Sequence, residues 1–336
     1  MKKKVFKIVK NISPVVILIF FAIFATCIGT KFIWIGSVFE QKCSSLDISI
    51  LTKIRLPRII ISIFCGALLG GTGAVFQGFF RNPLADAGIM GVSSGATFGA
   101  VMTSVFGGVF SFSLNLFVSP ITMFAFLGAI FSGVLVFAFS KIFRESSSVS
   151  LLLAGTAVGT FFSAVSSIII LSNQNQMHTF YAWTMGSFNG KGWNDFYIFL
   201  IPSIVAFILL ELCSKHLDVL VCGEQSAMAL GMNYNFVKNY VLFSGSLAAA
   251  CAVCAGGIIS FVGLIAPHVV RKIYGPLHKV LIFQSMIFGG ILLLVADTIS
   301  RTVIAPSEIP VGIITSLVGV PFFIFALVRM NGDVKK

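Results

Sequence analysis

Three consecutive pieces of sequence decide the class of fold: Arg55-Leu-Pro-Arg58, the uncharged run Ile59–Phe80, and Arg81-Asn82-Pro83. The run has 22 residues, about the length of helix that crosses the hydrocarbon core of a bilayer. Gly66 and Gly70 are spaced four apart within it and therefore share one helical face. Small residues at that spacing let helix backbones approach closely in lipid. The stretch predicts a membrane-spanning helix packed inside a bundle.

The composition of the whole chain agrees with a membrane protein. Of 336 residues, 57% are hydrophobic and only 10% are charged, whereas soluble domains carry about 25% charged residues. Disorder and a disulfide-rich secreted scaffold are excluded as main interpretations. The net charge of +12 is better explained by inner loops that face anionic lipid than by nucleic-acid binding.

The remaining uncharged runs predict an all-α, polytopic membrane protein with ten transmembrane helices in a single domain, residues 1–336. The first predicted span, Asn11–Thr30, follows a lysine-rich start and is longer than the apolar part of a signal peptide. The run Asn239–Val270 is too long for one span and short for two, and Gly256-Gly257 lies in its middle. Both termini are basic, so we expect both on the cytoplasmic side, which requires an even number of spans. Splitting this run gives ten.

The basic residues support one orientation. With the N-terminus inside, about 1–11 is cytoplasmic, about 36–57 and 172–193 are outer segments, and about 214–235 is an inner loop. Sixteen of the 23 lysines and arginines then lie inside, as the positive-inside rule expects. Three arginines remain outside and need an explanation: Arg55, Arg58 and Arg301.

Motifs for covalent or metal chemistry are weak. The run from Gly91 to Gly95 matches G-x-S-x-G around Ser93, but a hydrolase elbow needs a strand before the serine and a partner histidine and acid. The pair Cys251 and Cys254 has no second pair or nearby histidine to complete a metal site. We therefore expect no catalytic residue and no metal ligand in this chain. An intramembrane hydrolase remains a rival that labelling of Ser93 would favour.

Acidic residues are scarce in the predicted spans, and none lies near mid-membrane. Carriers coupled to an ion gradient usually show such a residue, or broken helices. The scarcity suggests that energy comes from a separate protein, with an ion-coupled secondary transporter as the alternative. In the inner loop, Glu224–Leu230 predicts a short helix ended by Gly231. Such a helix either docks to a partner or lies on lipid, and the residues alone favour neither.

Several blocks of sequence, in order, resemble the iron-chelate and cobalamin permease family (FecCD/BtuC-like). They are R-L-P-R, G-A-L-L-G-G-T-G-A-V-F-Q-G, R-N-P-L-A-D, G-E-Q-S-A-M-A-L-G, I-S-F-V-G-L-I-A-P-H-V-V-R, A-D-T-I-S-R and E-I-P-V-G-I-I-T-S-L-V-G-V-P-F-F. They cover the chain from about Arg55 to its C-terminus. Ala87 departs from the family, which usually has proline there.

The resemblance implies a ten-span, BtuC-like permease of a type II ABC importer in the cytoplasmic (inner) membrane. The family's cargo is a ferric siderophore, haem or cobalamin. Two permease chains, identical or paralogous, pair with two ABC ATPase subunits inside and an extracytoplasmic substrate-binding protein outside. This chain would hold no cofactor, because ATP and Mg bind to the ATPase.

The resemblance also implies three sets of site residues. Arg55, Arg58 and Arg301 correspond to arginines that pair with glutamates of the binding protein. The segment that fits a cleft on the ATPase corresponds to Gly223, Glu224, Gln225, Ala227, Leu230 and Gly231. The inner gate corresponds to Asn82, Leu84, Ser147 and Ser148.

Overall fold

The computed structural model describes residues 2–39, 43–110, 119–142, 148–173 and 177–333. Within these ranges the chain forms helices and no strand. The helices are α1 (Lys2–Cys27), α2 (Gly36–Phe39), α3 (Ser45–Ser49), α4 (Leu56–Phe80), α5 (Val92–Phe110), α6 (Pro120–Ile142), α7 (Ser148–Ser172), α8 (Met177–Thr184), α9 (Trp193–Leu220), α10 (Glu224–Ala229), α11 (Tyr234–Gly256), α12 (Val262–Tyr274), α13 (His278–Ser300) and α14 (Val311–Asp333). A π-helical turn, Ile50–Arg55, leads into α4, and a 3-10 turn, Ala87–Met90, precedes α5. The all-α prediction is confirmed.

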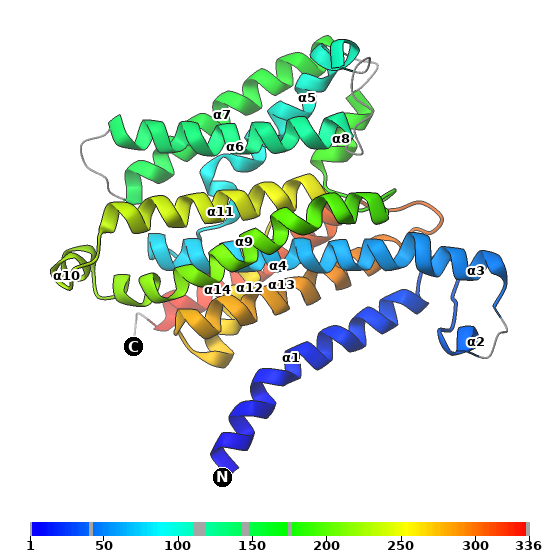
Figure 1. Cartoon of the computed structure of the whole chain (residues 1–336), viewed down its shortest axis with the longest axis horizontal. Helices are drawn as coiled ribbons and strands as arrows, with labels where there is room; N and C mark the ends of the chain where they lie inside the picture. The colour runs from blue at the N-terminus through cyan, green and yellow to red at the C-terminus, as the bar shows by residue number, and fades with distance from the viewer. Residues whose placement is uncertain (1, 40–42, 111–118, 143–147, 174–176, 334–336) are drawn as a thin grey trace.

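Helix α4, which contains the predicted span Ile59–Phe80, lies at the centre of the bundle. It packs against α9, α11, α12 and α13, while α5, α6 and α7 form a second group beyond α11 (Figure 1). Helix α1 lies at the opposite edge and packs mainly on α13. The sequence that reads as one buried span is therefore the element around which the others assemble.

Glycines set the distance between α4 and its neighbours. A methyl group at Gly66 would lie 2.3 Å from the carbonyl oxygen of Gly289 on α13, and one at Gly70 would lie 2.2 Å from that of Ser285. At Gly73 it would lie 1.9 Å from the carbonyl of Gly263 on α12. Dispersion contacts are the main force between helices in lipid, so close approach stabilises the bundle. The packing role predicted for the glycines of this helix is confirmed.

The ambiguous run Asn239–Val270 is broken where its glycines are. Helix α11 ends at Gly256, residues 257–261 are non-helical, and α12 begins at Val262. Helix α12 has 13 residues, about 20 Å of helix, which is less than a bilayer core. The non-helical residues before it supply part of the remaining length.

Six helices are long and apolar enough to cross a membrane by length and composition, and two shorter apolar helices accompany them among the described residues. The six spans are Ser45–Phe80, Pro120–Phe139, Ser150–Ser172, Trp193–Leu220, Tyr234–Gly256 and His278–Ser300. The multi-pass prediction is confirmed, whereas the count of ten stays a prediction. We call the end of the bundle with α2, α3 and α8 the outer end and the end with α10 the inner end (Figure 1), after the predicted orientation.

Candidate functional site

At the outer end, Arg58 joins three parts of the chain. Its guanidinium donates to both carboxylate oxygens of Asp297 on α13, with nitrogen–oxygen distances of 2.8 to 3.1 Å. The same group donates to Glu308 in the loop before α14 at 2.9 and 3.0 Å. Arg58 and Asp297 are both buried, and a planar guanidinium can serve two carboxylates at once. This cluster ties α4, α13 and the following loop together.

The other two outer arginines bind the C-terminal end of α1. Arg55 donates to the carbonyl oxygens of Thr26 and Cys27 at 2.8 and 3.0 Å. Arg301 donates to that of Ala25 at 2.7 Å, and its Nε lies 3.9 Å from Asp297. The last carbonyls of a helix have no partner within it and carry partial negative charge, so cations stabilise them. Both arginines therefore anchor α1 to the bundle.

The three arginines predicted for docking thus lie together at the outer end, but their guanidiniums face the chain's own acceptors. Each of the three residues is at most 5% exposed. Two lysines at the same end are exposed, Lys31 and Lys53. Nζ of Lys31 lies 2.6 Å from Oδ1 of Asp47. The docking role of the arginines stays a prediction, and the structure adds an internal role for each of them.

At the inner end, α10 forms the short helix predicted at Glu224–Leu230, although it ends at Ala229 with Leu230 as its C-cap. Gly223 and Gly231 bound it with φ of 111° and 87°, conformations that favour glycine. Ala227 is buried, whereas Gln225 is exposed and Leu230 is 74% exposed. The hydroxyl of Tyr234 donates to Glu224 at 3.1 Å and links this acid to the start of α11. The helix is held at its base and presents an apolar side chain outward.

The predicted gate residues are only partly described. Asn82 accepts a bond from the backbone N–H of Leu84 at 2.9 Å, which closes the turn after α4. Leu84 lines a narrow crevice with Phe261 before α12 and Phe322 on α14. Ser148 is the first residue of α7, and Ser147 lies outside the described residues. The structure brings Asn82 and Leu84 together and leaves the gate prediction untested.

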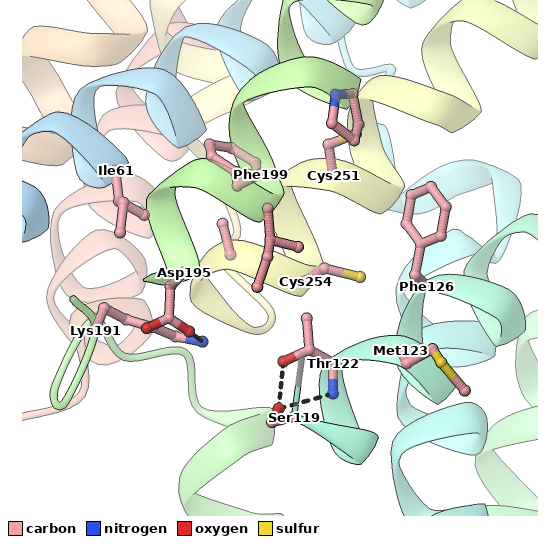
Figure 2. A pocket seen from close by; sticks show the side chains of 13 residues that line it. Ile61, Ser119, Thr122, Met123, Phe126, Lys191, Asp195, Phe199, Cys251 and Cys254 are labelled. Atoms are coloured by element: carbon pink, nitrogen blue, oxygen red, sulfur yellow. Dashed lines mark hydrogen bonds and ion pairs between the residues drawn. The ribbon is translucent and has the colours of Figure 1, made fainter. Parts of the chain in front are cut away.

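An apolar cavity of about 230 Å³ lies toward the outer end between α4, α6, α9 and α11 (Figure 2). The Lys191–Asp195 pair lies at one side of it, Cys254 points into it, and Ser119 bonds Thr122 at another side. Pockets for drug-sized ligands hold about 300–1,000 Å³. This cavity is too small for a bulky cargo. Among the described residues, no cluster of three or more His, Cys, Asp or Glu side chains could hold a metal ion.

The model of the FecCD transport family matches residues 16–329. The chain belongs to this family. The chain is 40% identical to the cobalamin import system permease protein BtuC of Halobacterium salinarum over 83% of this chain and 73% of that one. It is 34% identical to the hemin transport system permease protein HmuU of Yersinia pestis over 83% of each chain.

A solved structure of an ABC transporter shares the fold. It is described as an inward-facing conformation of an ABC transporter of metal-chelate type, and superposes with a TM-score of 0.85 at 29% identity. The alignment covers 95% of this chain and 98% of the other. The resemblance stated from the sequence blocks is therefore confirmed, and this FecCD chain is a transport component.

Sequence reasoning missed the partners of the arginines. It did not link Asp297 and Glu308 to Arg58. It also missed Asp218, whose carboxylate lies 2.7 Å from Nδ1 of the buried His278 at the inner end. The pairing of Asp297 and Glu308 with Arg58 could have been predicted, because two acids and three arginines at the same end of apolar helices need each other as partners.

Proposed function

We propose that this FecCD chain is the membrane permease subunit of an ATP-binding-cassette importer and moves a bulky metal chelate inward. The main observation behind the proposal is α10 at the inner end. Gly223 and Gly231, which both have positive φ, flank this helix, and Leu230 at its C-terminal end is exposed. A six-residue helix is not stable by itself, and an exposed apolar side chain on it suits a protein partner. Membership of the FecCD transport family supports an ABC ATPase as that partner.

The proposal includes the topology. Ten spans with both termini inside fit the described chain if α1, α4, α5, α6, α7, α9, α11, α13 and α14 each cross once and 257–274 crosses as one broken span. The start of α1 and the end of α14 both lie toward the inner end (Figure 1). The membrane would be the cytoplasmic (inner) membrane.

We propose that the transport path requires further protein chains. The outer cavity is too small for a chelate, so we place the path between this chain and a second permease chain, identical or paralogous. Two ATPase subunits would dock on the two copies of α10 and hold ATP and Mg. Closure of the ATPases on ATP would then move α9 and α11, which flank α10, and the turn with Asn82 and Leu84 would act as the inner gate with Ser147 and Ser148.

An extracytoplasmic binding protein would dock at the outer end. We propose that Arg55, Arg58 and Arg301 supply positive charge for its carboxylates. Because their guanidiniums are buried and Asp297 and Glu308 offset part of their charge, they would act through the net positive field of the cluster, which the exposed Lys53 strengthens. Direct pairing would require the outer loops to rearrange.

The names of relatives support this cargo class, and no single residue of this chain does. The two relatives above are named for cobalamin and haemin, which are both large metal macrocycles. A ferric siderophore belongs to the same class of bulky chelates.

Transport into proteoliposomes tests the proposal. The chain would be reconstituted with its ATPase and binding protein, and cobalamin, haemin and a ferric hydroxamate would be offered in turn. We expect ATP-dependent uptake of one of them, and no uptake when ATP is replaced by a non-hydrolysable analogue. Uptake of none, with every subunit present and active, would contradict the proposal.

One observation supports the rival, an ion-coupled carrier. The break between α11 and α12 is a broken helix of the kind that such carriers use. Uptake driven by a proton or sodium gradient without any ATPase would favour the carrier. The carboxylate of Asp86 lies beside Gly263 at the start of α12, so the rival has a candidate acid next to the break. We rank the carrier second because the family and the relatives are those of ABC permeases.

A further inference from the structure

A second feature of the inner end is a basic cleft that α10 does not form. It has a volume of about 530 Å³ and lies where α4, α9 and α12 end and α13 begins. We call it the inner basic cleft and define it by Gln77, Arg81, His268, Arg271, Lys272 and His278. Its volume is within the range of ligand sites.

The charge of the cleft has one sign. Arg81, Arg271 and Lys272 are basic, and none of the residues that line the cleft is acidic. Asp218 hydrogen-bonds a lining residue, His278. Its Oδ1 accepts from the backbone N–H of His278 and lies 2.7 Å from Nδ1 of the ring. Three cations that share a concave surface raise its positive potential and favour an anion.

Ordinary helix capping explains only part of this arrangement. Arg271 and Lys272 lie in the last turn of α12, where cations stabilise the carbonyl end of a helix. Arg81 belongs to a different helix. It is the C-cap of α4 and has a left-handed backbone conformation. Capping one helix does not require cations from two helices to face the same hollow.

The walls of the cleft also hold polar atoms that lack partners. Nε2 of His268 and Oε1 of Gln77 are buried and make no hydrogen bond among the described residues. Gln77 is 3% exposed, and its Nε2 donates a hydrogen bond to the carbonyl oxygen of Gly263. Leaving such groups unpaired costs about 1–3 kcal/mol each, so a polar ligand or its hydroxyl groups would stabilise the site.

An exposed apolar side chain, Val221, lines the cleft. Two more exposed apolar residues, Ile273 and Leu277, are direct chain neighbours of the lining residues Lys272 and His278. An amphiphile with an anionic head and apolar tails would cover both the cations and these apolar residues. Basic pockets between transmembrane helices on the cytoplasmic side suit phospholipid head groups, and arginine binds phosphate through its planar fork.

We propose that the inner basic cleft binds a phosphate group, supplied by the head group of an anionic phospholipid or by free inorganic phosphate. Arg81 and Lys272 hold the group from α4 and α12, and Arg271 contributes from the wall. A ligand here would fix the inner ends of α4 and α12 relative to each other, next to the turn that contains Leu84. The site is separate from α10, so it can be tested without an ATPase.

The test measures the thermal midpoint of the purified full-length chain in neutral detergent while one additive at a time is titrated. The additives are phosphatidylglycerol, phosphatidylcholine and inorganic phosphate. Native mass spectrometry counts the lipids that stay bound. The variants are Arg81→Gln and Lys272→Gln, both exposed in the cleft, and the matched control is Lys215→Gln, an exposed inner-end lysine on α9 outside it.

We expect phosphatidylglycerol to raise the midpoint and phosphatidylcholine to leave it unchanged. Each cleft variant should bind the lipid more weakly and raise the half-saturating lipid concentration about fivefold, and Lys215→Gln should not change that concentration. If inorganic phosphate gives the same rise and displaces the lipid, the free anion is the ligand. If only the lipid acts, the head group is the ligand. Absence of any rise with either, or an equal loss in the Lys215→Gln control, would overturn the proposal.

A folding defect can be separated from a binding defect. The midpoint without additive should be the same in both cleft variants and in the wild type, because the side chains replaced are exposed. If Arg81→Gln lowers this basal midpoint, Lys272→Gln alone decides the outcome. An unchanged lipid dependence in Lys272→Gln would then count against the site.

Discussion

Nη2 of Arg58 lies 2.8 Å from Oδ1 of Asp297, and this contact joins the start of α4 to the end of α13. Asp297 is fully buried and Arg58 nearly so. An unpaired charge is very costly in such surroundings, so each residue requires the other. The arginine that the positive-inside rule left unexplained is explained, at least in part, by an acid 239 positions away.

Removal of Asp297 should therefore destabilise the fold. We expect Asp297→Ala to lower the free energy of unfolding by about 3–5 kcal/mol, because it leaves the Arg58 charge without its main partner. Thermal unfolding in detergent measures the change. Lys31→Gln, which breaks the exposed pair with Asp47, is the control and should leave the midpoint unchanged. An Asp297→Ala chain as stable as the wild type would refute the structural role.

Close packing of α4 on α13 should be sensitive to a single methyl group. Gly70→Ala would place Cβ 2.2 Å from the carbonyl oxygen of Ser285, so the helices must move apart. We expect a loss of about 1–3 kcal/mol in the same unfolding assay. Gly192→Ala is the control, since its Cβ would meet nothing within 4 Å. Equal stability of the two variants would argue against the predicted interface.

Charge on α10 should uncouple transport without unfolding the chain. Leu230→Asp places a carboxylate on the surface proposed for the ATPase, and Leu230 is exposed, so the midpoint should not change. We expect at least a tenfold loss of ATP-driven uptake, the rate effect of about 1.4 kcal/mol. Leu230→Met, which keeps the apolar contact, should transport normally. Normal uptake by Leu230→Asp would remove α10 from the coupling mechanism.

The proposed orientation can be checked with two cysteines in a background without native cysteines. Gly192→Cys lies at the outer end and Ser226→Cys at the inner end, both at open positions. An impermeant thiol reagent applied to intact cells should label the first and reach the second only after lysis. The reverse pattern would invert the topology.

Much of this fold could be predicted from the sequence, because lipid imposes simple rules. A charge-free run of the right length that crosses a bilayer is expected to be helical, so α4 and the break at Gly256 could be predicted from composition and glycine position. Helix α10 was readable too, since Gly223 and Gly231 enclose it. Short segments without a composition signal, such as α2 and α8, were not predicted as separate helices.

Side-chain partners could not be predicted in the same way. Whether Arg58 faces a partner protein or Asp297 depends on the rotation and depth of two helices far apart in sequence. Neither quantity follows from hydropathy, and the charge count registers only that an arginine lies outside. The inner basic cleft is a similar case, because Arg81 and Lys272 converge only when α4 and α12 are packed together.

The central claim is that this FecCD chain works with a separate ATPase, and co-purification tests it most directly. A tagged chain would be extracted from its native membrane in mild detergent, its companions identified by mass spectrometry, and their ATP hydrolysis measured. We predict that a Walker-motif subunit co-purifies, hydrolyses ATP, and is lost with Leu230→Asp but retained with Leu230→Met. A chain that purifies alone, with no ATPase that binds it on reconstitution, would contradict the account and favour gradient-driven transport.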